Sequence, residues 1–269
     1  LSRSKCFLRG FLRGTALLFK DGVVGRFGRT HAVELHQVAA KLLAQPLGLL
    51  LGVVLHFDFQ KQVRTAHIPY TKSMACAICE TRRPRRACPG VRGEICSICC
   101  GTEREVSVEC PFDCVYLQEA RTHEKPAAME DQELPNQDIK LTEGFLRENE
   151  PLMVALSQGL VRALDEAPGI VDFDVREALD ALIRTYRTLE SGVYYETRPS
   201  NPLANHVCNQ AQHAVTELRT REREQLGMTR TRDADVLGML VFMQRLELDR
   251  NNGRRRGRAF LDLLRTEFG

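Results

Sequence analysis

Eight of the ten cysteines in this chain lie close together, and their spacing predicts metal binding. The cluster is Cys76, Cys79, Cys88, Cys96, Cys99, Cys100, Cys110 and Cys114. Two intervals are C-x2-C knuckles, in which a tight turn directs two thiolates toward one tetrahedral ion at about 2.3 Å. Glycine and proline residues flank the knuckles, as such turns require. Eight thiols suit two sites of four ligands each, and the metal we expect is zinc.

The spacing also favours one division of the ligands. The two knuckles together form one predicted zinc site, as in zinc ribbons and treble clefs: Cys76, Cys79, Cys96 and Cys99. The second predicted zinc site takes the other four: Cys88, Cys100, Cys110 and Cys114. Cys99 and Cys100 are adjacent and point in different directions, which suits membership of different sites. An interleaved cross-brace would have the same effect, and His123 could replace one thiolate, although a surface histidine is the simpler interpretation.

Other thiol chemistry fits the pattern less well. A redox dithiol needs a strand-to-helix junction in a βαβ unit, which the sequence does not indicate. Ferredoxin spacings of iron–sulfur ligands do not match, and a disulfide scaffold would require export. With every position filled by thiolate, zinc has no open position for water and would be structural. We therefore expect a binding or regulatory protein, not an enzyme, with a thiol redox protein or enzyme as the third alternative.

Arginines in the same segment suggest a second function. Arg82, Arg83, Arg85 and Arg86 lie between the knuckles, where they could attract phosphate. Aromatic residues that would stack on single-stranded bases are missing from this loop. A nucleic-acid-binding zinc finger is thus the alternative function, and a protein partner is the expected one.

The elements that position these cysteines must be small. A module of residues 74–124 can bury little apolar surface, so its folding free energy would come largely from the metal. Alternation from Glu105 to Glu109 predicts a short strand. Residues 125–139 are acidic, contain Pro126 and Pro135, and are predicted to form a linker.

Residues 140–269 follow helical periodicity and predict an all-α bundle, so the chain as a whole is predicted to be mainly α. Thr142 is expected to cap a short helix before Pro151, and Asp174 to cap the helix that follows Pro168-Gly169. After the Asp174 helix, a long helix is predicted from Asn201-Pro202 to Leu226, with Gly227 as its stop. Two further helices are predicted near 233–250 and 258–268.

Little in the predicted bundle suggests chemistry. His206, Gln210 and His213 share one side of a helix and are interpreted as surface polar residues, with Cys208 as a small buried residue nearby. Tyr194 and Tyr195 are expected to pack over helix ends. The basic run Arg254, Arg255, Arg256 and Arg258 is interpreted as a solvated loop between helices.

Charge separates the first quarter of the chain from the rest. Residues 1–73 hold eleven Lys or Arg against three acids, a net of +8, whereas residues 74–269 hold 27 against 32, a net of −5. We predict that residues 1–73 are translated sequence upstream of a start at Met74. The alternatives are a membrane helix, an organellar targeting segment, or a disordered or partly helical extension; the early apolar run is too short for a secretion signal. The cytoplasm is the expected compartment.

One resemblance accompanies these predictions. The run from Ala87 to Glu105, followed by Cys110-Pro111 and by Cys114 to Leu117, resembles a cysteine-rich opening found on uncharacterised bacterial proteins. The resemblance covers residues 74–124 and implies a bacterial protein that begins near Met74, without implying an activity. The Cys96–Cys99 knuckle is also distantly similar to that of small cross-brace zinc fingers, although the surrounding spacing differs.

Overall fold

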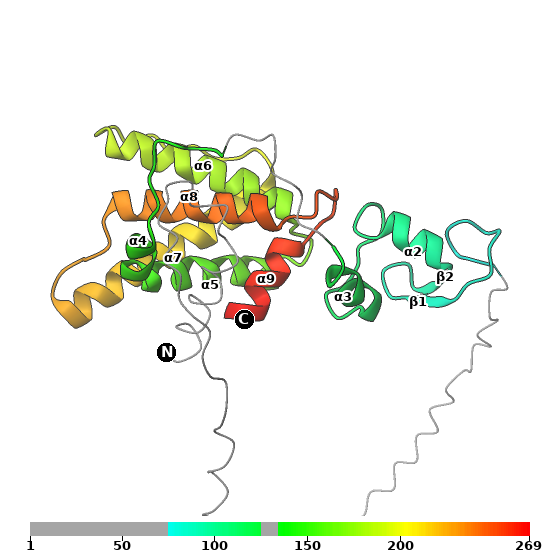
Figure 1. Ribbon diagram of the computed structural model, residues 1–269. Coiled ribbons are helices and arrows are strands. Elements are labelled where there is room, and N and C mark those ends of the chain that lie inside the picture. Colours follow the sequence, from blue (N-terminus) through cyan, green and yellow to red (C-terminus); the bar gives the residue numbers. More distant parts are fainter. Residues whose placement is uncertain (1–74, 125–133) are drawn as a thin grey trace, which may run out of the picture. The chain divides into compact units, whose positions relative to one another are not determined.

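The computed structural model describes residues 75–124 and 134–269, and this part of the chain is mainly helical, as predicted (Figure 1). The prediction for residues 1–73, including the start at Met74, lies outside the described residues, as do residues 125–133 of the predicted linker. Two segments are described below: the cysteine-rich segment, residues 75–124, and the helical domain, residues 134–269.

The cysteine-rich segment contains one hairpin and two short helices. Strands β1 (Arg86–Cys88) and β2 (Gly93–Ile95) pair antiparallel, with Ala87 opposite Glu94. Helix α2 (Ser97–Glu103) follows β2 directly, and α3 (Val115–Arg121) closes the segment. Gly90 is required in the hairpin turn, since a Cβ there would lie 2.4 Å from the backbone oxygen of Glu109. Steric contact with a later loop therefore fixes the position of the hairpin.

The strand predicted from Glu105 to Glu109 is wrong. These residues form a turn after α2, in which Val108 N–H donates to the Glu103 carbonyl at 3.1 Å. Glu105 has a φ of 52°, in the left-handed region that interrupts an extended strand. The carboxylate of Glu105 is fully buried, so the turn directs a charged side chain into the protein interior. The alternation of residue types had predicted a strand here.

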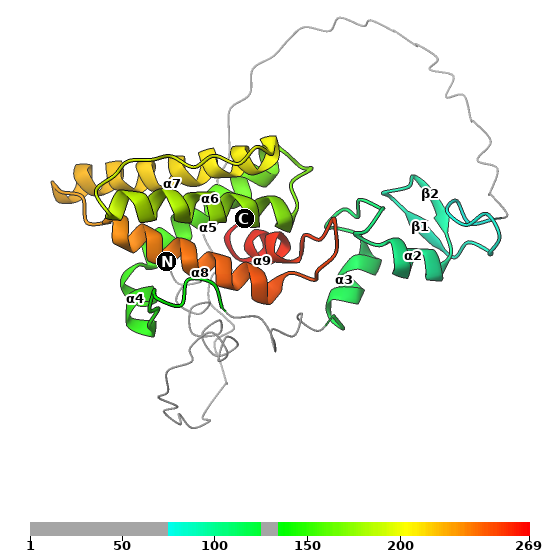
Figure 2. The same ribbon diagram turned by 90° about the horizontal axis from the view of Figure 1, so that it is seen from above.

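The helical domain consists of six helices within the described residues: α4 (Glu143–Glu148), α5 (Glu150–Glu166), α6 (Asp172–Glu190), α7 (Pro202–Leu226), α8 (Asp233–Arg250) and α9 (Ala259–Phe268). Helix α5 packs against α7 and α9, and α6 packs against α7 and α8 (Figure 2). Helix α8 is buried on most of its surface, from Asp235 to Glu247. No helix in the described ranges is long and apolar enough to cross a membrane.

Several helix ends confirm the sequence prediction. The Thr142 hydroxyl accepts a hydrogen bond from Phe145 N–H at 3.1 Å, and Pro151 lies in the first turn of α5. The Asn201 side chain accepts from Leu203 N–H at 3.0 Å, which caps α7. Gly227 ends the same helix with a φ of 73°, a conformation that glycine adopts without strain.

The cap of α6 differs from the prediction. The helix begins at Asp172, and Asp174 occupies its third position, where the carboxylate accepts from Val171 N–H at 2.9 Å. The Asp172 carboxylate instead caps another helix, α9, by accepting from Phe260 N–H at 3.0 Å and Leu261 N–H at 3.1 Å. Both acids therefore cap helix termini, but neither is the N-cap residue of α6.

One apolar core holds the helical domain together. Its buried side chains come from all six helices and include Leu146, Leu156, Leu179, Leu240 and Phe260. Helices α5 and α7 approach closely at Gly159, where a Cβ would lie 2.9 Å from the Cβ of Ala214. Cys208 is buried in this core, as predicted, and burial raises the pKa of its thiol to about 12.

The basic run after α8 contacts the cysteine-rich segment, so its interpretation as a solvated loop is wrong for two of the arginines. Arg254 donates to the carbonyl oxygen of Arg104 at 2.6 Å, and the buried Arg258 donates to that of Cys110. Arg255 is exposed. The carbonyl oxygens of Arg104 and Cys110, both in the loop after α2, thus accept hydrogen bonds from guanidinium groups that were predicted to be solvated.

Glu105 is a fully buried acidic residue at this contact. Its fully buried carboxylate accepts from Arg121 at 2.8 Å, from Asn252 at 2.7 Å and from the backbone N–H of Arg258 at 3.1 Å. Arg121 also pairs with Asp262 on α9. A buried carboxylate requires such charged and polar partners, so Glu105 connects the cysteine-rich segment to the start of α9.

Candidate metal centre

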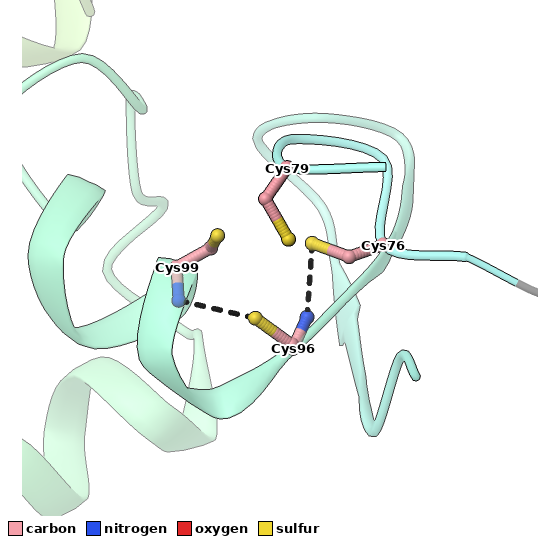
Figure 3. Close-up of side chains that lie close together, drawn as sticks. All are labelled: Cys76, Cys79, Cys96 and Cys99. Atoms are coloured by element: carbon pink, nitrogen blue, oxygen red, sulfur yellow. Dashed lines mark hydrogen bonds between the residues drawn. The ribbon is translucent and has the colours of Figure 1, made fainter. Parts of the chain in front are cut away.

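Four thiols converge at one point in the cysteine-rich segment (Figure 3). Cys76 and Cys79 lie on the turn before β1, Cys96 is the N-cap residue of α2, and Cys99 lies in the first turn of that helix. All four sulfur atoms lie within 4.8 Å of one another. Both C-x2-C knuckles therefore meet, as their spacing predicts, and the group could hold a metal ion.

Backbone hydrogen bonds fix the positions of these sulfur atoms. Cys96 N–H donates to the Cys76 sulfur at 3.2 Å, and Cys99 N–H donates to the Cys96 sulfur at 3.4 Å (Figure 3). The first knuckle is held to the hairpin, because Ala77 N–H donates to the Glu94 carbonyl at 2.9 Å. Amide donors of this kind stabilise negative charge on sulfur, and metal-bound cysteine carries that charge as thiolate.

Two thiols of the group have a lowered pKa. Hydrogen bonds from the Thr81 side chain and backbone, and from the backbone of Arg82, lower the pKa of Cys79 to about 5. Burial raises the pKa of Cys76, but backbone hydrogen bonds, led by those from Cys79 and Cys96, outweigh it and leave the pKa lowered. Cys79 thus supplies thiolate at neutral pH, the form that binds a metal ion.

The pKa of the fourth thiol moves in the opposite direction. Burial and the neighbouring thiols raise the pKa of Cys99 to about 12. Negative charges crowded into one place make the last proton hard to remove, and a divalent cation among the sulfurs would relieve that repulsion. Cys76, Cys96 and Cys99 are buried, which keeps water from the group.

The other four predicted ligands lie near this group but do not join it. Cys88 ends β1, Cys100 is in α2, Cys110 is in the loop before α3, and Cys114 is the N-cap residue of α3. Within residues 75–124 and 134–269, no second set of three or more His, Cys, Asp or Glu side chains converges as closely as the first. His123 is exposed at the end of α3, in keeping with its simpler interpretation as a surface residue.

The four predicted phosphate-binding arginines are not equivalent. Arg82, Arg83 and Arg85 are exposed, whereas Arg86 is half-buried. Arg86 donates to the Cys100 sulfur at 3.3 Å, and its guanidinium lies 4.5 Å from the centre of the Tyr116 ring. Arg86 therefore faces a thiol and an aromatic ring instead of solvent.

Sequence reasoning missed three residues around the thiols. Thr81 supports the Cys79 thiolate, the Arg82 side chain hydrogen-bonds to Cys96, and Arg86 contacts Cys100. A hydroxyl two residues after a knuckle is a signal that could have identified Thr81 as a sulfur partner. The contact of Arg86 spans the hairpin and joins two elements, so no local pattern indicates it.

The helical domain holds an open cavity of about 610 Å³ between α5 and α7, but its charged groups already pair. Arg162 and Glu217 form an ion pair at 2.9 Å, and His213 lies 3.6 Å from the same carboxylate. Tyr194 and Tyr195 are 70% and 64% exposed, so the predicted packing over helix ends is wrong.

Comparison with known proteins adds no further constraint. No protein-family model, no curated protein and no solved structure matches the chain.

Proposed function

We propose that this chain is a zinc-binding protein in which the metal is structural and the cysteine-rich segment acts as a binding or regulatory module. The observation that carries the proposal is the convergence of the sulfurs of Cys76, Cys79, Cys96 and Cys99 within 4.8 Å of one another. Four thiolates are the ligand set of structural zinc sites and leave no position open for a reacting water molecule.

The order of elements around the thiols supports zinc. A knuckle, a hairpin and a helix that begins at the second knuckle follow one another along the chain. This is the arrangement of a treble-clef finger, in which the ion joins the turn to the helix N-terminus. Zinc suits the site because it has no geometric preference beyond the tetrahedron that four sulfurs impose.

The small core of the segment explains why a metal would be structural. Around the thiols, Ile95 is the sole aliphatic side chain of the described residues that is fully buried with Cys76, Cys96 and Cys99. Such a cluster removes too little apolar surface from water to stabilise a fold of this size. Binding of structural zinc contributes about 10–16 kcal/mol in isolated fingers, which is enough to fold the module.

Elemental analysis of the full chain tests the proposal. Wild-type protein should contain zinc, and Cys76→Ser should lose the ion of this site. Cys208→Ser is the matched control, because Cys208 is a buried cysteine in the helical domain and should leave the zinc content unchanged. Wild-type protein without bound zinc, or Cys76→Ser with an unaltered content, would contradict the proposal.

A protein partner belongs to the proposed binding role. Exposed apolar side chains in the loop after α6 support it: Val193, Tyr194 and Tyr195 are 60%, 70% and 64% exposed. Tyrosine is enriched at protein interfaces, where its ring is buried and its hydroxyl is hydrogen-bonded. Chemical crosslinking in cells should give a heteromeric product whose yield falls in Tyr194→Ser/Tyr195→Ser, and an unchanged yield would argue against this loop.

Nucleic-acid binding is the second candidate function, and the exposure of Arg82, Arg83 and Arg85 favours it. Each phosphate contact releases counterions, so the affinity for an oligonucleotide would fall steeply as salt increases. Replacing Arg83 and Arg85 by Gln should lower the slope of log affinity against log salt by about one for each arginine, and Arg82 is left in place because its side chain also hydrogen-bonds to Cys96. Arg147→Gln, at an exposed arginine on α4, is the control. Absence of salt-dependent binding in the wild type would eliminate this candidate.

A further inference from the structure

A second cavity lies beside the first thiol group. It is small, with about 10 Å³ open to the centre of a water molecule, which suits an ion and excludes an organic ligand. Its lining residues include Cys99 of the first group and the other four cysteines of the cysteine-rich segment: Cys88, Cys100, Cys110 and Cys114. They come from β1, α2, the loop before α3 and the start of α3, so the cavity brings together residues that are far apart in the sequence.

The walls of this cavity are apolar and partly closed. Ile95, Val108 and Leu117 line it and are buried. Cys88 and Cys114 pack against the buried cluster that contains Cys110, Val108 and Leu117, so three of the four cysteines lie close together.

Two arginines beside the cavity suggest that its four cysteines do more than pack in an apolar cluster. Arg86 directs a guanidinium N–H at the Cys100 sulfur, 3.3 Å away. Arg104 also lines the cavity, and its Nε is buried without a hydrogen-bond partner among the described residues. Neutral thiols give such cations little to interact with, whereas a metal centre of four thiolates carries a net charge of −2. Two positive side chains at the same cavity would balance that charge.

We propose that Cys88, Cys100, Cys110 and Cys114 form a second tetrathiolate zinc site, with Arg86 and Arg104 as positioning residues that stabilise its negative charge. The proposal deepens the proposed function and rests on it. Binding forms four zinc–sulfur bonds at about 2.3 Å and releases the thiol protons to solvent. Because the four sulfurs are less closely grouped than those of the first site, their side chains must rotate toward the cavity for the site to close.

A second ion would have a structural role distinct from that of the first. The first site joins the turn before β1 to α2, whereas the second would join the hairpin and α2 to α3. Arg258 donates to the Cys110 carbonyl and lies 4.4 Å from the centre of the Phe112 ring. The second ion would therefore order the loop by which the segment contacts the start of α9.

Metal stoichiometry of the full chain, measured by native mass spectrometry with elemental analysis, tests the proposal. We expect two zinc ions in the wild type and in Cys208→Ser, and one in Cys88→Ser/Cys110→Ser. Cys76→Ser/Cys99→Ser should lose both ions, because loss of first-site ligands is expected to unfold the segment that also holds the second site. One ion in the wild type, retained in Cys88→Ser/Cys110→Ser, would overturn the second site and leave the proposed function standing. No ion in the wild type would overturn both.

Titration of the metal-free wild-type chain with Co²⁺ covers the case in which Cys88→Ser/Cys110→Ser fails to fold and loses both ions. Thiolate-to-cobalt absorption should increase until two equivalents have been added, and saturation at one equivalent would overturn the second site. Arg86→Gln should weaken the second binding step about 10- to 100-fold, as substitution of a residue that supports metal ligands typically does. Arg85→Gln, at the exposed neighbouring arginine, should leave both steps unchanged; equal effects of the two variants would remove Arg86 from the proposal.

Discussion

The helical domain and the cysteine-rich segment bury different kinds of side chain. Aliphatic and aromatic residues from six helices meet in one continuous core in the helical domain. The cysteine-rich segment has two small clusters, and cysteines contribute to both, Cys76, Cys96 and Cys99 in one and Cys110 in the other. The first region has an apolar core of the kind that the hydrophobic effect stabilises, whereas the proposed function implies that the second region needs bonds to a metal. Perturbations that act on one source of stability should therefore leave the other region folded.

The largest expected effect comes from removing a ligand of the first thiol group. Cys99→Ser should unfold the cysteine-rich segment, because zinc binding and folding of such modules share one free energy, about 10–16 kcal/mol in isolated fingers. Hydrogen exchange followed by mass spectrometry should show loss of protection in residues 75–124 and retained protection in α5 to α8. Retained protection in both regions would show that the segment folds without this ligand.

A substitution in the apolar core should destabilise the helical domain and leave the cysteine-rich segment folded. Phe260 is fully buried at the start of α9, and Phe260→Ala should lower the free energy of unfolding of the domain by about 3–5 kcal/mol through lost burial and a cavity. Chemical denaturation followed by circular dichroism measures the change. The zinc content should stay the same, and a fall in zinc content would show that the two regions are more tightly coupled than the comparison implies.

Asp172 should make the stability of the helical domain depend on pH. Burial, together with the charges of Glu247 and Glu105, raises the pKa of Asp172 to about 7 from an ordinary value of 3.8. Since the folded pKa exceeds the unfolded one, the native state binds the proton more tightly. This group's contribution is fully present below about pH 4 and is lost as the pH rises to about 7, by up to about 1.4 kcal/mol per pH unit.

Replacing the carboxyl group isolates that contribution. Asp172→Asn keeps an oxygen that can accept from the N–H groups of Phe260 and Leu261 and should flatten the fall in stability between about pH 5 and pH 7. Unfolding curves of wild type and variant, recorded across this range, provide the measurement. Parallel pH profiles would show that Asp172 does not carry the effect.

The smallest of these effects should come from the contact between the two regions. Glu105→Gln keeps the size of the buried side chain but removes the charge that Arg121 faces, at a cost of about 1–3 kcal/mol. Exchange protection near Asn252 and Arg258 should decrease, while the zinc content stays constant. An effect as large as that of Cys99→Ser would mean that this contact, and not the metal, folds the cysteine-rich segment.

Local patterns predicted much of the helical domain because local chemistry decides it. The Thr142 and Asn201 caps and the Gly227 stop are each specified by a residue and its near neighbours, and the structure places them where the sequence does. The N-terminal cap of α6 was wrongly predicted at Asp174, because Asp172, two residues earlier, is equally suited to the start of a helix. Only the distant α9 N-terminus, which Asp172 caps, distinguishes the two.

The candidate metal site likewise has a part that local sequence predicts and a part that distant contacts decide. Knuckle spacing is local, so it identified the group that contains Cys76 and Cys99. The surroundings of Glu105 and Arg254 depend on contacts between segments about 150 residues apart, which alternation and charge runs do not encode. Charged residues that look solvated in the sequence were therefore the least predictable part of the structure.

The central claim is that metal, and not apolar burial, folds the cysteine-rich segment. Two-dimensional ¹⁵N–¹H spectra of the labelled full chain, recorded before and after zinc is removed by a chelator, test it directly. Resonances from residues 75–124 should collapse to the narrow dispersion of an unfolded chain, while those of α5 to α8 persist. Added zinc should restore the first spectrum. Dispersed resonances from residues 75–124 in the metal-free protein would contradict it.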